Sequence, residues 1–383
     1  MGMRVICGLM VAALAACEVV ESDKTAAKQD TVGAPAIVSE SARGSVATDS
    51  TLGPAPAGAD SALARTAAGD SSRAGVADDT GTVRFHPAAP RRGGVLFALA
   101  EGVASPSPRC TWKSAPIPCY RAGDGVIVTV PLPADEDAGT FTLTIDRPAG
   151  RIVRQIEVGN RDFGRELIFL PDSLYRRATN TREIARDARA VRGIASVETS
   201  DRRWNGRWRE PVGGSRGSGY GVERYYYRAT DSTRSITLDT QARTRGTFGA
   251  DTSDAAFTGA PSWRHAGIDM PARRGAAIVA PAAGQVADVG EYILSGRTVL
   301  IDHGHGAVSA YFHLDTALVA KGDMVRAGQR IGRVGATGLA TGPHLHFAIY
   351  LHGKDVDPDA WRDMPDWLLS PRSSQGDSSR QQR

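Results

Sequence analysis

Short runs of alternating apolar and polar residues dominate one long segment in the first half of the chain. Three clear examples are Val126–Val130, Thr140–Ile145 and Ile152–Val158, and they are separated by glycine, proline and aspartate. Because the side chains of a strand alternate between two faces, these runs predict half-buried β-strands joined by turns. Several such strands in a row indicate a β-sandwich over residues 82–172.

The next segment has helical periodicity. Its apolar residues recur every three or four positions and would cover one face of a helix. They are Ile184, Ala188, Val191 and Ile194. With Thr181 as the expected N-cap, this pattern predicts a helix within residues 173–203 that links the sandwich to a second domain. The second domain, residues 204–366, is expected to consist mostly of antiparallel strands.

The pattern of His344–Leu351 predicts a strand with two different faces. The odd-numbered residues from Leu345 to Leu351 are large and apolar, so they would enter a core. The opposite face begins with His344 and His346, which would point toward a cleft. Two adjacent imidazoles on such a face indicate a metal site or a site of proton transfer.

His265 and Asp269 supply the further ligands that a metal site would need. Imidazole and carboxylate groups both suit zinc, and a catalytic zinc site typically uses three protein ligands plus water. His265, Asp269 and His346 would make such a set. Four residues of flat strand would separate the first two by roughly 13 Å, and Pro271 argues against a helix. We therefore expect a bend at Gly267.

A series of short motifs surrounds these residues in a fixed order. It includes Val299-Leu-Ile-Asp-His-Gly304, Tyr311-Phe-His-Leu314, Lys321-Gly-Asp-Met-Val-Arg-Ala-Gly-Gln329 and Thr341-Gly-Pro-His-Leu-His-Phe347. A lone His-x-His pair is a weak signal, whereas the ordered series is specific. Over about residues 263–360 the chain resembles the lysostaphin-type (LytM-like) zinc metallopeptidases, which cleave peptide bonds in peptidoglycan.

The resemblance implies roles for five residues. His265, Asp269 and His346 would bind one Zn²⁺ per catalytic domain, and His313 and His344 would form the catalytic pair. One of this pair would take a proton from water and the other would stabilise the developing negative charge, and which does which stays open. The implied fold is mainly β, with an immunoglobulin-like sandwich, a linking helix and an antiparallel β-sheet metallopeptidase domain.

The chain departs from the family pattern ahead of the first ligand. The family usually has a short loop between a Gly-x-Arg-like strand and that ligand, whereas Tyr220, Gly221 and Arg224 precede His265 by a long stretch. The intervening residues 225–262 could wall a substrate groove or could simply add strands. A tyrosine that assists the oxyanion therefore stays unassigned.

As a function, the resemblance implies a zinc-dependent endopeptidase that hydrolyses peptide cross-links in peptidoglycan. In a Gram-negative envelope the expected bond joins D-alanine to meso-diaminopimelate. The alternative is a non-catalytic relative that binds and activates another cell-wall hydrolase. Such relatives generally lack several zinc ligands, whereas all five positions are present here.

The N-terminus predicts export. Residues 1–16 carry one basic residue and an apolar run too short to span a bilayer, which is typical of a signal peptide. Leu14-Ala-Ala-Cys17 resembles the lipobox of bacterial lipoproteins, and an ordinary cleavage site is the alternative. Because Glu18 follows, we expect a periplasmic protein held at the outer membrane by a lipid on Cys17.

Composition indicates how the folded part is attached. Residues 17–81 are rich in small and polar residues and have few aromatic ones, so we expect a disordered tether. Residues 367–383 are expected to form a disordered tail. The net charge of +4 over 383 residues gives no signature of nucleic-acid binding.

Cys110 and Cys119 are expected to form a disulfide. Of the four cysteines, Cys7 would leave with the signal peptide and Cys17 would take the lipid. The remaining two have no other thiol to pair with, and an oxidising periplasm stabilises disulfides.

The other histidines are expected to be structural. His303 and His305 alternate with two glycines, which predicts a tight turn, and a second metal site is the alternative. His86 and His352 have no partners nearby in the sequence, so we expect them at the surface or in turns.

Overall fold

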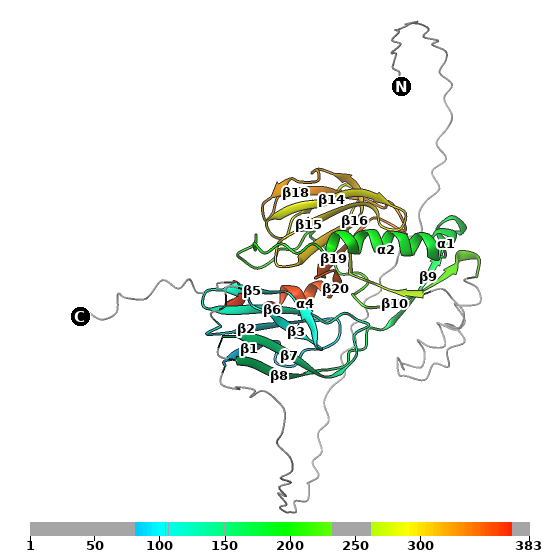
Figure 1. Cartoon of the computed structure of the whole chain (residues 1–383). Coiled ribbons are helices and arrows are strands. Elements are labelled where there is room, and N and C mark those ends of the chain that lie inside the picture. The colour runs from blue at the N-terminus through cyan, green and yellow to red at the C-terminus, as the bar shows by residue number, and fades with distance from the viewer. Residues whose placement is uncertain (1–80, 104, 106, 149, 232–261, 370–383) are drawn as a thin grey trace, which may run out of the picture. The chain divides into compact units, whose positions relative to one another are not determined.

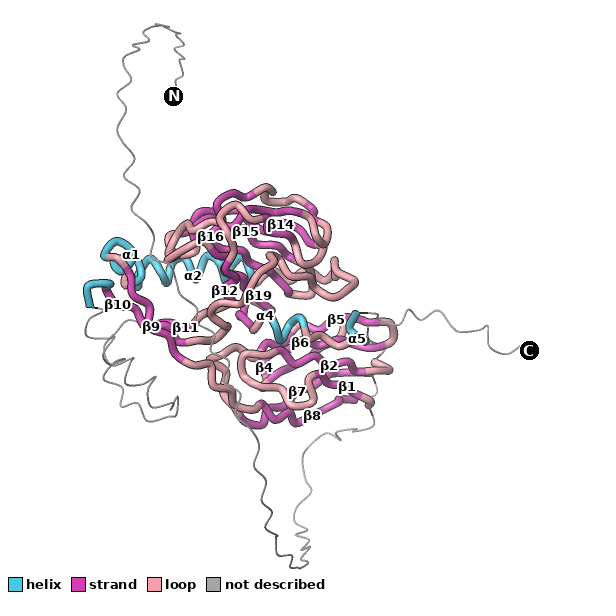
Figure 2. The backbone as a smooth tube through the Cα atoms, turned by 180° about the vertical axis from the view of Figure 1, so that it is seen from behind, coloured by secondary structure: helices cyan, strands magenta, loops and turns pink. Residues whose placement is uncertain are grey.

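The computed structural model describes residues 81–103, 105, 107–148, 150–231 and 262–369 (Figure 1). Every described residue lies in one compact unit of the chain. The expected signal peptide, Cys17 and nearly all of the tether therefore lie outside the described residues. Within the described part, no helix is long and apolar enough to cross a membrane. Strands far outnumber helices in it (Figure 2), as the predicted mainly β fold requires.

Two four-stranded antiparallel sheets form a β-sandwich between residues 83 and 158. The first sheet runs, in spatial order, β1 (Val83–His86), β2 (Val95–Ala100), β6 (Gly125–Pro131), β5 (Cys119–Ala122). The second runs β4 (Ala115–Ile117), β3 (Cys110–Trp112), β7 (Gly139–Arg147), β8 (Gly150–Val158). Their facing side chains share one apolar cluster. The alternation in the sequence thus has its expected cause, because one face of every strand enters a core.

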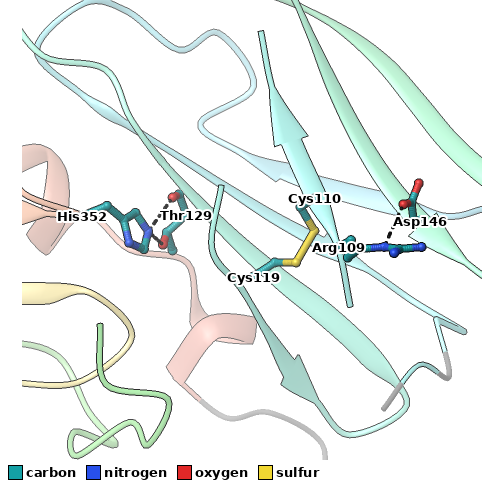
Figure 3. The surroundings of a disulfide bond; sticks show 6 residues. All are labelled: Arg109, Cys110, Cys119, Thr129, Asp146 and His352. Carbon is teal, nitrogen blue, oxygen red and sulfur yellow. Dashed lines mark hydrogen bonds and ion pairs between the residues drawn. A yellow bond between two sulfur atoms is a disulfide. The ribbon is translucent and has the colours of Figure 1, made fainter. Parts of the chain in front are cut away.

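A disulfide joins the two sheets of the sandwich. Cys110 on β3 and Cys119 on β5 are bonded, with Cα atoms 6.2 Å apart (Figure 3). The two cysteines are nine positions apart in the sequence. Because β3 and β5 belong to different sheets, the bond links the sheets covalently.

The strand β9 (Arg165–Leu170) does not join the sandwich, although it falls inside the range 82–172 expected for that domain. It pairs in parallel with β10 (Glu223–Arg228), which pairs antiparallel with β11 (Ser262–Arg264). The expected sandwich range included these residues, because no local pattern can identify a strand partner more than fifty residues away.

Two helices, rather than one, follow β9. They are α1 (Asp172–Ala178) and α2 (Thr181–Ala195). The N-cap of α2 is Asn180, whose side chain accepts a hydrogen bond from the Glu183 amide, so the expectation of Thr181 as the cap was wrong by one residue. The apolar side of α2 packs through Val191 and Ala195 onto the large C-terminal sheet.

The C-terminal domain is built on a nine-stranded antiparallel sheet, as predicted. Its main path is β12 (Ile268–Pro271), β19 (His344–Leu351), β16 (Ala307–Ala317), β15 (Gly296–Asp302), β14 (Gly284–Tyr292), β17 (Met324–Val325). Three further strands pair at its margins: β13 (Ala277–Val279), β18 (Arg330–Val334), β20 (Lys354–Val356). The described elements are completed by the 3₁₀ turn η1 (Ala229–Asp231) and the helices α4 (Pro358–Arg362) and α5 (Asp366–Leu369). Residues 367–369, expected in a disordered tail, instead belong to α5, where Leu368 is buried.

One apolar core joins the sandwich to the C-terminal sheet. Phe97 of β2 lies 5.6 Å from Trp361 of α4 between ring centroids, and Trp208 lies 5.4 Å from the same indole. Trp204 packs edge-on against Trp361 at 5.8 Å. Since all four rings are buried, the sandwich sheet that contains β2 is covered on both faces.

Candidate metal centre

The pairing of β12 with β19 sets two candidate ligands opposite each other. Asp269 is the cross-strand partner of His346, and Ile268 is that of Phe347. Directly opposite residues on antiparallel strands point their side chains to the same face at close range. The register of two strands thus makes one half of the site.

Gly267 brings the third candidate ligand back to this pair. The backbone bends at Gly267, between β11 and β12, as predicted. A Cβ atom at this position would lie 2.3 Å from the Phe347 carbonyl oxygen and 2.9 Å from His346 Nε2. Glycine is therefore required because the backbones approach closely, rather than because the chain adopts an unusual dihedral angle.

Three ligand atoms converge at this point. His265 Nε2 lies 2.7 Å from His346 Nδ1 and 3.1 Å from Asp269 Oδ1, and the latter two atoms are 3.0 Å apart. Among the residues described by the structure, this is the one group of three or more acidic, histidine or cysteine side chains arranged to hold a metal ion.

The tautomer of His265 is set by the segment that precedes the long insertion. His265 Nδ1 donates a hydrogen bond to the Gly219 carbonyl at 2.7 Å, which leaves the lone pair of Nε2 directed at the other two ligands. Backbone bonds from Gly221 to His265 and from His265 to Val222 hold this segment in place. The long stretch in sequence therefore does not separate Tyr220 and Gly221 from the first ligand in space.

Asp269 is an ionised carboxylate with two differently engaged oxygens. Oδ1 faces the two histidines, and Oδ2 accepts a hydrogen bond from Arg224 Nη2 at 2.5 Å. Burial alone would raise the pKa of this carboxyl, but hydrogen bonds and charge from His265 and His346 outweigh burial and hold the pKa well below its usual range.

A β-bulge aims His313 at the site. Between β15 and β16, Arg297 pairs with Leu314 and Val299 pairs with Tyr311, so β16 has one extra residue there. His313 lies in this irregularity with a φ of 62°, in the left-handed region that few non-glycine residues adopt. Bulges of this kind redirect a side chain, and strained dihedrals persist where the surrounding structure enforces them.

His313 and His344 form a pair beside the three ligands. Their ring centroids are 4.8 Å apart, and His344 Nε2 lies 3.6 Å from Asp269 Oδ1. Each ring donates from Nδ1 to a backbone carbonyl at 2.8 Å, His313 to Thr337 and His344 to Gly342. Both Nε2 atoms are thus left to accept a proton or, when protonated, to donate a hydrogen bond.

A family model described as peptidase family M23 matches residues 263–358. The match contains all five residues of the site. The chain carries a peptidase M23 domain, of the lysostaphin and LytM type.

Two curated relatives of the M23 domain have different names. One is the peptidoglycan DD-endopeptidase ShyB of Vibrio cholerae, 39% identical over 93 residues, which are 24% of this chain and 22% of that protein. Another is the murein hydrolase activator NlpD of Salmonella dublin, 41% identical over 101 residues, 26% of either chain. The chain therefore matches only about a fifth to a quarter of the length of these relatives.

Among solved structures, a Pseudomonas aeruginosa protein described as a peptidase M23 is similar to this chain. It is 24% identical, the similarity covers 71% of this chain and 94% of that one, and the TM-score is 0.48.

The donor set of the M23 domain fits zinc. Bonds of about 2.0–2.2 Å from a tetrahedral zinc ion would place its ligand atoms roughly 3.4 Å apart. The observed separations of 2.7–3.1 Å are close to this value. Two imidazole nitrogens and one carboxylate oxygen also leave the fourth position of a catalytic site open.

Burial keeps two histidines of the M23 domain neutral. It lowers the pKa of His346 to about 4, and it lowers that of His313 to about 3 with help from the neighbouring His344 and His346. At pH 7 both rings are therefore in the neutral form that ligates a metal or accepts a proton.

The histidines outside this site have partners of their own. Gly304, His305 and Gly306 form the predicted turn, with positive φ at each. His303 is fully buried, with Nδ1 2.8 Å from the Ala283 carbonyl and Nε2 2.7 Å from Ser309 Oγ. Among the described residues, the turn does not bring together a further group of three or more histidine, cysteine or acidic side chains.

His352 lies in a turn but is not an isolated surface residue. Its Nδ1 lies 2.8 Å from Glu198 Oε1, and its Nε2 lies 3.2 Å from Thr129 of the sandwich (Figure 3). Its side chain is only 8% exposed. No local pattern indicated this role, because both partners are distant in the chain.

Proposed function

We propose that this chain is a zinc-dependent endopeptidase that hydrolyses peptide cross-links in peptidoglycan, at the bond between D-alanine and meso-diaminopimelate. The observation that carries the proposal is the convergence of His265, Asp269 and His346 beside His313 and His344. The relative named as a peptidoglycan DD-endopeptidase supports this choice of substrate.

Three residues would hold the metal through His265 Nε2, Asp269 Oδ1 and His346 Nδ1. When bound, zinc supplies Lewis-acid chemistry, in that it polarises a carbonyl oxygen and makes water more acidic. Carbonyl acceptors on the far side of the His265 and His344 rings hold them in one orientation. The protein therefore offers a preformed site that needs little rearrangement when substrate arrives.

His313 and His344 would move protons and stabilise charge. Since each ring uses Nδ1 for a backbone carbonyl, Nε2 is the atom that meets the substrate. The low pKa of His313, about 3, makes it a poor carrier of a resting positive charge. We therefore propose that His344, the more exposed of the two with 16% of its side chain accessible, takes the proton of the attacking water. His313 would then assist at the developing oxyanion by donating a hydrogen bond from Nε2 once that atom carries a proton, because Nδ1 already donates to Thr337.

The sandwich is proposed to be a fixed part of the enzyme rather than a spacer. It shares a core with the C-terminal domain through Phe97, Trp204, Trp208 and Trp361. An interface of buried aromatic residues favours a constant position of one domain against the other. We propose that it helps to present the site to cross-links, on a protein held in the periplasm at the outer membrane through a lipid on Cys17.

A second candidate function is activation of another cell-wall hydrolase. The relative named as a murein hydrolase activator favours it. The presence of all five site residues, with their ring nitrogens and carboxylate oriented together, favours catalysis instead.

Purified muropeptide dimers cross-linked between D-alanine and meso-diaminopimelate would test the proposal. We expect the zinc-loaded chain to convert them to monomers, which liquid chromatography with mass spectrometry detects. His344→Ala protein serves as the matched control. Two results together would instead support the activator function. The wild-type chain would leave the dimers intact, and an added amidase would hydrolyse peptidoglycan faster in the presence of the chain than in its absence.

A further inference from the structure

The metal centre extends beyond the residues that match the M23 family model. Asp269 directs Oδ1 at the histidines, and its Oδ2 accepts the short hydrogen bond from Arg224. Arg224 lies on β10, ahead of the matched range 263–358. A residue from outside the matched range therefore holds the one carboxylate ligand.

Arg224 is itself held by a second acidic residue. Its Nε donates to Glu166 Oε2 at 3.3 Å, and Ser218 Oγ donates to the same oxygen at 2.8 Å. The parallel register of β9 and β10 places Glu166 opposite Arg224. The unexpected pairing of β9 with β10 is therefore what brings this carboxylate to the site.

These three charges are shielded from water to different degrees. The side chains of Arg224 and Asp269 are 15% and 14% exposed, and that of Glu166 is 34% exposed. Burial by itself would lower the pKa of Arg224, but Asp269 and Glu166 raise it, so the guanidinium stays charged. Removing one member of a shielded, hydrogen-bonded charge pair leaves the other without compensation.

We propose that Arg224 and Glu166 are positioning residues of the metal centre. Arg224 holds Oδ2 of Asp269, so the carboxylate presents a single oxygen, Oδ1, to the metal. Glu166 fixes the orientation of Arg224. This inference rests on the zinc site of the proposed function, and it assigns to that site residues from two strands outside the M23 match.

A purely structural ion pair is the competing explanation. It would stabilise the fold without affecting the metal. Arg228 provides a matched control, because it lies on the same strand and pairs with Asp172 at 2.9 Å on the exposed surface, where the side chains are 43% and 59% accessible.

The test is the zinc affinity of the full chain, measured by competition with a chromophoric chelator. Outer-shell partners of metal ligands typically contribute about 10- to 100-fold in affinity. We expect Arg224→Gln to weaken zinc binding by about that factor, Arg224→Lys to recover part of it, and Glu166→Gln to cost about 3- to 10-fold. Arg228→Gln should stay within about twofold of wild type, because surface ion pairs contribute little.

Two further readouts separate a positioning role from a structural one. Cobalt substitution should give a changed visible absorption band in Arg224→Gln and an unchanged band in Arg228→Gln. The melting temperature of the zinc-free proteins reports on the fold alone. If Arg224→Gln does not fold, the zinc affinities of Arg224→Lys and Glu166→Gln test the proposal instead.

The outcomes are distinct from those of the cleavage assay. Zinc affinity that is equal in Arg224→Gln and Arg228→Gln would overturn the positioning role while leaving the endopeptidase intact. A wild-type chain that binds zinc in an Arg224-dependent way but cleaves nothing would overturn the endopeptidase alone. A wild-type chain that binds no zinc would overturn both.

Discussion

Two groups of histidines in this protein differ in how their ring nitrogens are used. In the candidate metal centre, His265 Nε2 and His346 Nδ1 face each other and one oxygen of Asp269 at 2.7–3.1 Å. At the other group, His303 and His352 each place both ring nitrogens near separate acceptors or hydroxyl groups. In the first group, lone pairs converge on a common point. In the second group, each ring nitrogen has its own hydrogen-bond partner.

The partners of the ring nitrogens indicate which histidines have a structural role and which have a chemical one. A buried histidine whose nitrogens have separate partners stabilises the fold, as His303 does between Ala283 and Ser309. Histidines that converge without such partners need a cation or a proton between them. Each group should therefore respond differently to substitution.

The largest effect is expected from His346→Ala. This change removes one of three ligands, so zinc content and cleavage of cross-links should fall together to background. Metal analysis by mass spectrometry and the muropeptide assay measure the two quantities. His352→Ala, in the other group, should keep full zinc content. Bound zinc at the wild-type level in His346→Ala would contradict the ligand assignment.

The next largest effect is expected from His344→Ala. His344 Nε2 lies near Asp269 Oδ1, but the residue is not one of the three convergent ligands. Turnover should fall by roughly 10²- to 10⁴-fold, the usual contribution of a general acid or base, while zinc stays bound. The same two assays separate binding from catalysis. A zinc-loaded and fully active His344→Ala protein would refute the role of this residue.

A smaller effect concerns stability against pH in the structural group. Burial lowers the pKa of His303 to about 4, against about 6.5 in an unfolded chain. Between these values the unfolded chain binds the additional proton, so stability is lost as pH falls from 6.5 toward 4. From pH 7 to pH 5 this residue alone should remove about 2 kcal/mol of unfolding free energy.

Urea unfolding of wild type and His303→Gln at both pH values measures this contribution. The loss between pH 7 and pH 5 should be about 2 kcal/mol smaller in the variant, because the amide does not titrate. Equal losses in the two proteins would show that His303 titrates normally in the folded state.

The smallest effect is expected from His352→Ala. This change removes contacts to Glu198 and Thr129 that tie the sandwich to the C-terminal domain. We expect a loss of about 1–2 kcal/mol in unfolding free energy with unchanged zinc content. Calorimetry of the zinc-loaded protein reports the first quantity. A loss of zinc here would show that the two histidine groups are coupled.

Local patterns predicted much of the fold. Alternation on β19 separated the apolar face, which enters the main core, from the face that begins with His344 and His346. The face that begins with the two histidines continues with Ala348 and Tyr350, which pack in one apolar cluster with residues of α2. The bend at Gly267 followed from the distance between two ligands. These features depend on neighbours within a few residues, which a sequence displays directly.

Long-range contacts could not be predicted in this way. The parallel pairing of β9 with β10 and the contact of Arg224 with Asp269 depend on segments that are distant in the chain. The partner of His352 on the sandwich is 223 residues away. No local period or spacing encodes such a partner, because the contact exists only after both domains have packed.

The proposed endopeptidase activity depends on zinc held by His265, Asp269 and His346. Zinc content of the purified chain is determined beside its release of monomers from cross-linked peptidoglycan, before and after chelation. We expect about one zinc per chain and monomer release that chelation abolishes and added zinc restores. Monomer release that persists in the zinc-free protein, or intact cross-links in a fully zinc-loaded one, would contradict the claim.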